Sequence, residues 1–342
     1  MTGRRAWRWL LTPLEPLYRG VVAARGHAYR RGWMHSARLA VPVVSVGNLT
    51  FGGTGKTPTV IALVRDLVRR GRRPAVLSRG YGRTASHPVV LVGPEPGVTP
   101  AIAGDEPLEM AARLPGVPVV VDADRARGGV EAVRRGADLL VLDDGFQHLA
   151  LDRDLDLVLI DAGDPWGGGR LPPRGRLREP VSAVARADAV LVTKLPADAD
   201  PVLAEVRAVL DEVAPGTPVL AARLAPTAVR RPDGRTGPEI LDGARVVALA
   251  GIGRPEGFAE LLRGSGAVVC ATRWFDDHHR YSRDEIDEAV AAATSVDAVV
   301  VTTAKDAVKL PEDAPVWVVE AAMVPLDGGW DALWRLLPGG TA

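Results

Sequence analysis

A short apolar run, a glycine-rich loop and an amphipathic segment follow one another between residues 41 and 71, and they constrain the fold most. Residues 41–46 (VPVVSV) predict a buried strand, and apolar residues at helical spacing over 60–68 predict a helix that ends near Gly71. The strand and the helix enclose Gly52-Gly53-Thr54-Gly55-Lys56-Thr57. A strand, a glycine-rich loop and a helix in this order form the context of a P-loop. The sequence therefore predicts an α/β fold with a mostly parallel sheet flanked by helices.

The loop residues have separate expected roles in binding a nucleotide. Backbone N–H groups of Gly52, Gly53, Thr54 and Gly55 would approach the phosphates, aided by the partial positive charge of the helix N-terminus. Lys56 would reach the β- and γ-phosphates, and the Thr57 hydroxyl would bind Mg²⁺. The match is not literal, because Thr50 stands where the usual motif has its first glycine. The alternative is a glycine-rich turn that only caps the helix.

Composition limits the class of protein. The 342 residues predict two domains or one large α/β domain, and 47% apolar with 25% charged residues excludes a disordered chain. Lys plus Arg (42) equals Asp plus Glu (42), which argues against a nucleic-acid partner bound through overall basic charge. The single cysteine, Cys270, excludes an intrachain disulfide and fits a reducing compartment. Apolar runs long enough to span a membrane as a helix are absent.

Acidic residues follow two further apolar stretches. Residues 137–142 predict a strand that ends in Asp143-Asp144, and an acid at this place in a P-loop enzyme holds Mg²⁺; Asp143 is the expected ligand. Asp105, in Gly104-Asp105-Glu106-Pro107, could be a general base for an attacking hydroxyl. For both segments a plain turn is the alternative.

The first 39 residues differ from the rest of the chain. They carry eight arginines against one acid, Glu15, with aromatic and aliphatic residues between them. This composition is typical of a helix that lies in the headgroup zone of an anionic membrane, and an ordinary amphipathic helix packed on the domain is the alternative. Four segments are expected: residues 1–39 contacting the membrane, a P-loop domain over 40–224, a connection over 225–243, and a smaller α/β domain over 244–342 that closes over the active site.

The motifs, taken together, resemble those of the tetraacyldisaccharide 4′-kinase (lipid A 4′-kinase) family. The resemblance spans about residues 41–310 in family order, and the arginine- and tryptophan-rich start is also similar. Besides the P-loop it covers Gly47-Asn48-Leu49-Thr50, residues 78–83, 104–107, 143–148, 177–180, 250–255, 275–279 and 305–309. One departure is Ala304, which replaces the family's usual glutamate, and another is the loop over residues 167–176, with Gly168 for asparagine and added arginines.

The resemblance implies a reaction, a site and a location. The γ-phosphate of ATP would pass, with Mg²⁺, to the 4′-hydroxyl of a tetraacyldisaccharide 1-phosphate, with Asp105 and His278 as a catalytic dyad. The enzyme would be peripheral at the cytoplasmic face of the inner membrane, with no obligate protein partner. Further family positions lining the site are Asn48, Asp144, Gln147, His148, Arg178 and Glu179.

Two other functions use the same loop. A GTPase switch would need a carboxylate to read guanine, and Pro196 occupies that position after Val192-Thr193-Lys194-Leu195. A membrane-bound partitioning-type ATPase would carry a second lysine just before Gly52, where this chain has Phe51. A non-enzymatic scaffold is the weakest alternative, because Lys56, Thr57 and Asp143 are all present.

Overall fold

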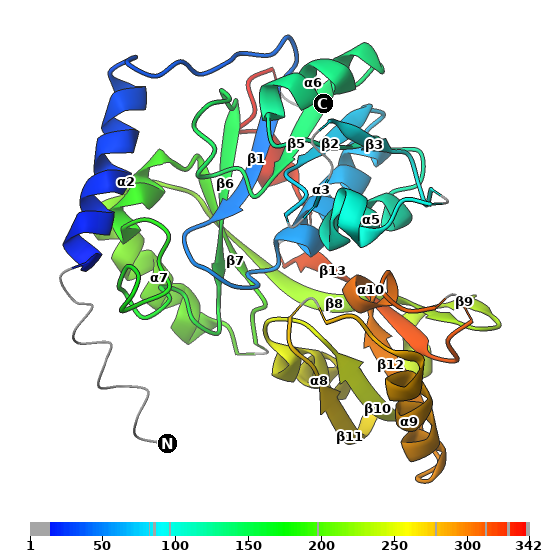
Figure 1. Cartoon of the computed structure of the whole chain (residues 1–342). Coiled ribbons are helices and arrows are strands. Elements are labelled where there is room, and N and C mark those ends of the chain that lie inside the picture. The colour runs from blue at the N-terminus through cyan, green and yellow to red at the C-terminus, as the bar shows by residue number, and fades with distance from the viewer. Residues whose placement is uncertain are drawn as a thin grey trace. The chain divides into compact units, whose positions relative to one another are not determined.

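The computed structural model describes residues 14–81, 83–84, 87–95, 97–196, 198–277, 279–311, 313–326 and 329–339. The chain forms two compact units. Unit 1 comprises the residues up to Arg79, Gly116–Arg223 and the residues from Met323 onward; unit 2 comprises Gly80–Pro115 and Leu224–Ala322. Figure 1 shows the elements by label.

A parallel sheet forms the centre of unit 1. Its strands follow the order β8-β7-β6-β1-β5-β2-β4, and each neighbouring pair is parallel. Apart from β8, the strands are buried along their whole length, because helices cover the faces of such sheets. The fold expected from the sequence is confirmed. The bounds are β1 Val43–Asn48, β2 Pro74–Ser78, β4 Val119–Val121, β5 Leu139–Asp143, β6 Leu155–Asp161, β7 Ala189–Thr193 and β8 Val219–Arg231.

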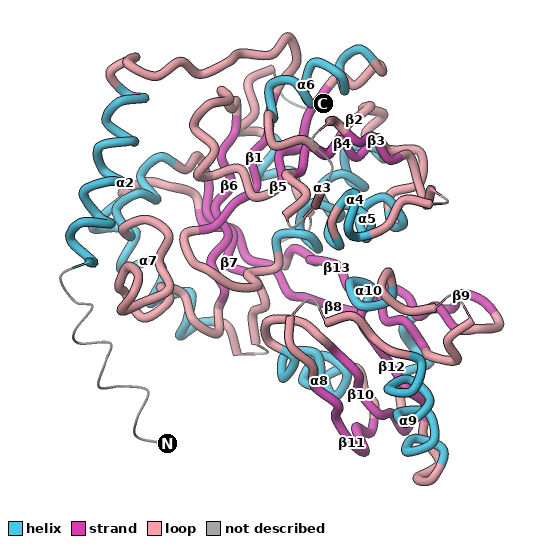
Figure 2. Tube along the Cα trace, viewed as in Figure 1, coloured by secondary structure: helices cyan, strands magenta, loops and turns pink. Residues whose placement is uncertain are grey.

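The helices of unit 1 connect these strands. Helix α3 follows β1 and buries Val60, Ile61, Leu63, Val64 and Leu67 on the apolar face that the sequence predicts. The amphipathic helix α2 precedes β1, and the first 13 residues of the expected N-terminal segment lie outside the described residues. Figure 2 distinguishes helices and strands by colour. The bounds are α2 Leu14–Arg30, α3 Lys56–Arg69, α6 Arg125–Arg134, η1 Val181–Arg186, α7 Asp200–Val213 and α11 Asp331–Trp334.

The strands of unit 2 are mostly parallel and belong to the same hydrogen-bonded strand order as β8. Strands β11, β10, β12 and β13 pair in this order, and β9 forms a hairpin with the second half of β8. The elements are β3 Val89–Leu91, α4 Pro100–Ala103, α5 Asp105–Arg113, β9 Gly234–Thr236, η2 Pro238–Leu241, β10 Arg245–Ala250, α8 Pro255–Gly264, β11 Val268–Trp274, α9 Arg283–Thr294, β12 Val299–Thr303, α10 Ala304–Ala307 and β13 Trp317–Pro325.

The division into units differs from the linear one expected. Residues 80–115 belong to unit 2, because α5 packs against α10 and Arg113 donates a hydrogen bond to the Ala321 carbonyl at 2.6 Å. Residues 225–243, expected as a connection, form the end of β8, β9 and η2 within unit 2. These contacts join residues far apart in the chain, so domain boundaries predicted from continuous stretches of sequence differ from the boundaries of the two units.

Candidate active site

The glycine-rich loop lies between β1 and α3, as the sequence predicts. Gly52 and Gly55 have φ angles of 123° and 85°, values that side chains other than glycine rarely adopt. A Cβ atom on Gly55 would lie 2.6 Å from the terminal methyl of Met323, so the position is also closed sterically. Gly53 and Thr54 occupy the bend between them, and Thr54 N–H donates to the Gly52 carbonyl at 3.1 Å.

Lys56, the first residue of α3, points back to the end of β1. Its ammonium donates to Oδ1 of Asn48 at 3.4 Å and lies 3.6 Å from Oδ1 of Asp144. Asn48 is fully buried, and its side-chain amide donates to the Thr50 carbonyl at 2.7 Å, which fixes the orientation of Oδ1. The sequence brings these residues together because β1 ends beside the carboxyl end of β5.

Two adjacent carboxylates lie at the end of β5 but have different surroundings. Asp143 is buried at the strand end and accepts a hydrogen bond from the Ser78 hydroxyl at 3.2 Å. Asp144 turns the chain with a φ of 53° and binds Nη1 of Arg178 through both oxygens, each at 2.8 Å. Burial alone would raise the pKa of Asp144, but the charges of Lys56 and Arg178 outweigh it and hold the pKa below its ordinary value. Asp144 is therefore ionised at neutral pH.

Gln147 and Arg178 complete this group. The Gln147 amide donates to the Asn48 carbonyl at 3.0 Å, and Arg178 lies 3.4 Å from Gln147 Oε1. The Arg178 guanidinium also lies over the ring of Phe51, 5.2 Å from its centre. The Lys56 cluster, meaning Asn48, Lys56, Asp144, Gln147 and Arg178, is thus connected by hydrogen bonds and ion pairs.

Three other predicted residues lie in unit 1 but have other contacts. Thr57 is nearly buried in the first turn of α3. Glu179 forms two hydrogen bonds with Arg186, at 2.8 and 3.1 Å, and so anchors the loop that carries Arg178. Burial, followed by the charges of Arg125, Arg153 and Arg25, lowers the pKa of His148 to about 4, so its ring is neutral at neutral pH.

Asp105 lies in unit 2, at the first position of α5. The preceding Gly104 has a φ of 93°, and a Cβ there would lie 3.3 Å from Gly80 Cα. His278 lies outside the described residues. Its neighbour Asp277 pairs with Lys305 at 3.0 Å, and His279 contacts Glu285 at 3.1 Å.

Lys305 is a residue that the sequence reading did not assign to the site. Burial would lower the pKa of its ammonium, but Glu106 and Asp277 raise it above its ordinary value. The Lys305 charge thus faces both the α5 segment that begins at Asp105 and the loop next to position 278. Both of these segments belong to unit 2, whereas the sequence reading placed Asp105 and His278 on different domains.

Arg125, Asp161 and Lys194 are further residues that the sequence reading did not assign. Arg125 is 4% exposed at the start of α6, and burial lowers the pKa of its guanidinium, which Asp143 and Asp144 partly offset. Asp161 is the last residue of β6, as Asp143 is of β5. The same pattern in the sequence, an acid at the end of an apolar strand, indicates Asp161 as a candidate. Lys194 is one of only four lysines in the chain.

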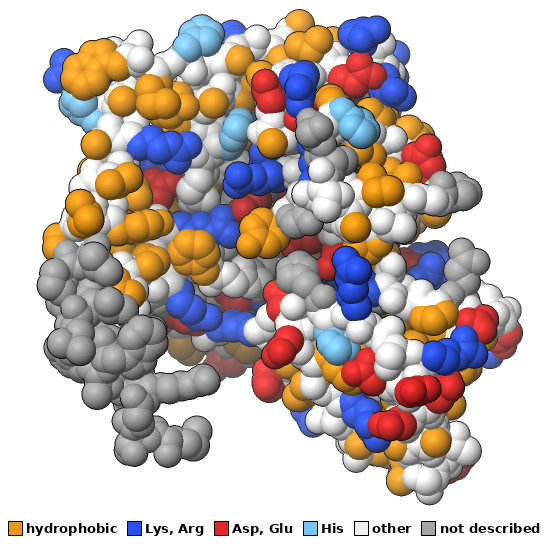
Figure 3. Space-filling view, in the orientation of Figure 1, with side chains coloured by type: hydrophobic (Ala, Val, Ile, Leu, Met, Phe, Trp, Pro, Cys, Tyr) orange, Lys and Arg blue, Asp and Glu red, His pale blue; other side chains and the backbone are white. Residues whose placement is uncertain are grey.

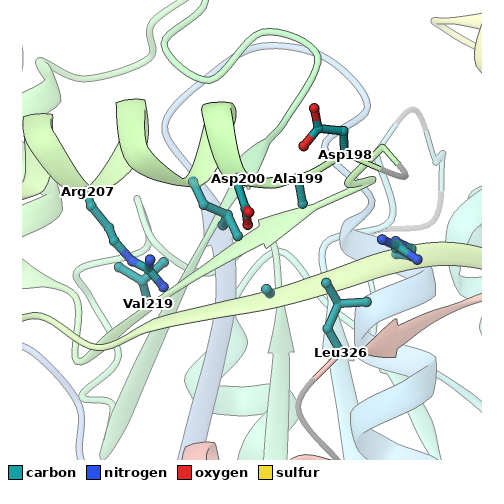
Figure 4. Close-up of a pocket in the computed structure, with 9 residues that line it drawn as sticks. Asp198, Ala199, Asp200, Arg207, Val219 and Leu326 are labelled. Atoms are coloured by element: carbon teal, nitrogen blue, oxygen red, sulfur yellow. The ribbon is translucent and has the colours of Figure 1, made fainter.

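A separate cavity of about 350 Å³ lies in unit 1 between α7 and β8. Figure 4 shows Arg207 on α7, Val219 on β8 and Leu326 around it, with Asp198 and Asp200 nearby. Among the described residues that line this cavity, none belongs to the predicted site.

A magnesium ion would find oxygen ligands at this site. In the described part of the chain, His, Cys, Asp and Glu do not form a group of three or more suited to a metal. A magnesium held by the Thr57 hydroxyl, the Asp143 carboxylate and phosphate oxygens needs no such group, because Mg²⁺ usually takes one or two protein carboxylates and keeps waters or phosphates. The donor set therefore fits the ion.

The parallel sheet, the glycine-rich loop and the lysine at the start of α3 define a P-loop nucleotide-binding protein. The family model described as Tetraacyldisaccharide-1-P 4'-kinase matches residues 7–337. The tetraacyldisaccharide 4'-kinase of Anaeromyxobacter sp. (strain Fw109-5) is 47% identical over 310 residues, 88% of this chain and 83% of the relative. That of Chromobacterium violaceum is 42% identical over 330 residues, 92% of this chain and 90% of the relative.

A solved structure is also similar over the whole length. LpxK from Aquifex aeolicus, described as a complex with ATP, has a TM-score of 0.77 and 31% identity, covering 97% of this chain and 98% of the other. The chain belongs to the tetraacyldisaccharide-1-phosphate 4'-kinase family. It is therefore a kinase of lipid A biosynthesis, and the resemblance seen in the sequence is confirmed. The family sets aside the GTPase, partitioning ATPase and scaffold alternatives.

Proposed function

We propose that unit 1 binds ATP with Mg²⁺, and that the γ-phosphate passes to the 4′-hydroxyl of tetraacyldisaccharide 1-phosphate with Asp105 as the base. The observation that carries the nucleotide site is the Lys56 cluster beside the glycine-rich loop. Lys56 is held between Asn48 and Asp144, and only 12% of its side chain is exposed. ATP in the related Aquifex aeolicus structure supports the choice of nucleotide.

The P-loop supplies positioning and charge. The Thr54 hydroxyl is buried and has no hydrogen-bond partner among the described residues, which suits a donor to a phosphate oxygen. Lys56 would neutralise charge on the β- and γ-phosphates. Asp144, which is itself bound by Arg178, pairs with the Lys56 ammonium and holds it in this position. Thr57 and Asp143 would hold Mg²⁺, which when bound neutralises phosphate charge.

Asp105 would accept the proton of the acceptor hydroxyl. The hydroxyl oxygen forms the new bond to the γ-phosphorus, the bond to the β–γ bridging oxygen breaks, and ADP leaves with that electron pair. The proton moves to the Asp105 carboxylate. Asp105 is the first residue of α5, so its place in the chain is fixed at a helix N-terminus. His278 would orient or tune this carboxylate, as the family resemblance implies.

Helix α2 provides a surface for the membrane. Leu17 and Val21, four residues apart, are 65% and 61% exposed, and Trp33 just beyond the helix is 75% exposed. Figure 3 shows hydrophobic side chains over the part of unit 1 where α2 lies. A neighbouring face of α2 contacts the loops of the site: Tyr18 donates to the Arg178 carbonyl at 3.1 Å, and Arg25 donates to the Gln147 carbonyl at 2.8 Å.

The acyl chains of the substrate and this apolar face both favour a lipid surface. We place the enzyme peripherally at the cytoplasmic face of the inner membrane. None of the described helices is both long and apolar enough to cross a bilayer.

The test of the reaction is phosphate transfer from labelled ATP to tetraacyldisaccharide 1-phosphate in detergent micelles. Lys56→Met should lose product formation, and Asp105→Asn should lower kcat by roughly 10²- to 10⁴-fold with KM for ATP nearly unchanged. Asp233→Asn, an exposed aspartate on the β8–β9 turn, is the matched control and should keep full activity. Wild-type ATP hydrolysis without a lipid product would contradict the assigned acceptor, and full activity of Asp105→Asn would contradict the assigned base.

Sedimentation with phospholipid vesicles tests the membrane surface. Leu17→Ser with Val21→Ser should lower the fraction bound to anionic vesicles, because it removes apolar area from the exposed face of α2. Val130→Ser, on α6 and 53% exposed, is the matched control. Equal binding of the double variant and the control would contradict the assignment of this face.

A further inference from the structure

The end of β7 contacts the P-loop. Thr193, the last residue of β7, and the next residue, Lys194, each donate a hydrogen bond to a backbone carbonyl of the loop. We propose that Lys194, with Asp161 and Thr193, is a positioning group that holds the P-loop in its nucleotide-binding conformation. The inference rests on the nucleotide site proposed above and concerns residues that no part of that proposal uses.

Lys194 links the loop to a buried carboxylate. Its ammonium donates a hydrogen bond to the Gly53 carbonyl and lies 2.9 Å from Oδ2 of Asp161. The Asp161 side chain is 7% exposed at the end of β6, so it offers a fixed acceptor. Because the ammonium sits between this carboxylate and a loop carbonyl, it ties the P-loop to the sheet rather than to a phosphate.

The backbone of Lys194 shows that this contact is built into the fold. Its φ angle is 56°, in the left-handed region that residues with a Cβ seldom occupy. Such a conformation persists where the surroundings fix it. Here it directs the side chain back over the end of β6 toward Asp161 and Gly53.

Thr193 holds the next loop carbonyl. Its hydroxyl is fully buried and donates to the Thr54 carbonyl at 2.8 Å. In a planar trans peptide the carbonyl and the following N–H point in opposite directions. Binding of the Thr54 carbonyl by Thr193 therefore turns the Gly55 N–H away from β7. Two successive loop carbonyls, of Gly53 and Thr54, are thus fixed by Lys194 and by Thr193, the last residue of β7.

This arrangement gives Lys194 a role distinct from that of Lys56. Lys56 contacts Asn48 and Asp144 on the side of the predicted phosphates, whereas Lys194 contacts a backbone carbonyl and Asp161. Loss of Lys194 should therefore weaken nucleotide binding, because the free loop must be ordered at each binding event. A charge-assisted hydrogen bond of this kind corresponds to roughly a tenfold to hundredfold change in affinity.

The test measures ADP binding to the full-length protein without lipid, by fluorescence titration, and then kcat and KM for ATP. Lys194→Met should raise the Kd for ADP and the KM for ATP by about tenfold or more, with kcat at saturating ATP within about threefold of wild type. Thr193→Val should shift both in the same direction by less. Lys194→Arg keeps the charge but places a larger planar guanidinium between the two acceptors, and should restore the affinity only in part.

Arg134→Met is the matched control, because it removes an exposed cation of unit 1 whose ion pair is with the neighbouring Glu131 on α6. Unchanged Kd and KM in Lys194→Met would overturn the inference. It would also be overturned if the nucleotide-free melting temperature fell enough to account for the affinity loss, since the role would then be structural only. Failure of wild type to bind ADP better than Lys56→Met would instead contradict the proposed nucleotide site, so the two failures are distinguishable.

Discussion

His148 should make the stability of unit 1 fall as the pH is lowered from about 6.5 to about 4. Burial lowers the pKa of its imidazole to about 4, and the charges of Arg125, Arg153 and Arg25 act in the same direction. An unfolded chain has no such surroundings, so its histidine titrates near its ordinary pKa of about 6.5. Between these two pH values the unfolded chain binds a proton that the folded protein does not.

The sign and size of the effect follow from linkage. Because the unfolded state binds more protons between pH 4 and 6.5, the free energy of unfolding falls as the pH is lowered through this window. A fall in the pKa from 6.5 to about 4 corresponds to at most about 3.4 kcal/mol, at about 1.36 kcal/mol per pKa unit. The ring is partly exposed, and solvent screens its interactions with the arginines, so we expect about 1–2 kcal/mol.

Urea denaturation of wild type and His148→Gln from pH 4 to 7 measures this contribution. The variant carries no titrating ring, so its free energy of unfolding should decline less than that of wild type as the pH falls from 6.5 to 4. NMR of ¹³C-labelled histidine, with His148→Gln to assign the signal, reports the pKa directly. Parallel stability curves, or a His148 pKa at or above 6.5, would refute the reasoning.

Three further changes test other parts of the structure. Gly55→Ala should lower the free energy of unfolding by about 1–2 kcal/mol, because φ is 85°, and should weaken ADP binding. Adding Met323→Ala removes the side chain that the new Cβ would meet, so in urea denaturation it should recover only the part of the loss that comes from this clash. Trp334→Phe removes the indole donor, 2.7 Å from Asp66, and should lower the free energy of unfolding by about 1–2 kcal/mol at pH 7. The difference from wild type should shrink below pH 3.8, where Asp66 with its lowered pKa becomes protonated, and a pH-independent difference would argue against this role of Asp66. Lys305→Met should lower kcat without changing the Kd for ADP, and equal kcat in steady-state assays would contradict its place beside the expected dyad.

Local features of the fold could be predicted because short-range patterns determine them. The strand expected at 41–46 is β1 at Val43–Asn48, and the helix expected up to Gly71 is α3 at Lys56–Arg69. Both predictions rest on the local spacing of apolar residues, and Gly52 and Gly55 stand where the backbone needs positive φ angles. Lys56 and Asp144 could be placed in one site because parallel strands bring their carboxyl ends to one edge of the sheet.

Contacts between distant segments could not be predicted in this way. The assignment of residues 80–115 to unit 2 depends on Arg113 reaching the Ala321 carbonyl, a contact with no sequence signature. Likewise the Lys194–Asp161 pair depends on the left-handed backbone of a residue other than glycine. Such pairs follow from the register of β6 and β7, which only the packed sheet defines.

The lysines show how a compositional hint becomes a structural argument. The chain has four lysines in a background of arginine, and each forms an ion pair inside its own unit: Lys56 with Asp144, Lys194 with Asp161, Lys305 with Asp277 and Lys309 with Asp306. Their side chains are 12%, 26%, 19% and 3% exposed, whereas the arginines range from Arg113 at 5% to Arg38 and Arg134 at 76% exposed.

A compact ammonium suits the positions that the lysines occupy. Its three donors converge on one point, so it fits between two acceptors in a confined space, such as the Gly53 carbonyl and Asp161, where a planar guanidinium needs more room. The most buried pair, Lys309 with Asp306, lies in unit 2 beside Tyr281, whose pKa is raised first by burial and then by Asp306. Lysine in this chain therefore stands where a carboxylate holds the ammonium in place, and two of the four lie at the phosphate-binding loop: Lys56 pairs with Asp144, and Lys194 binds the Gly53 carbonyl beside Asp161.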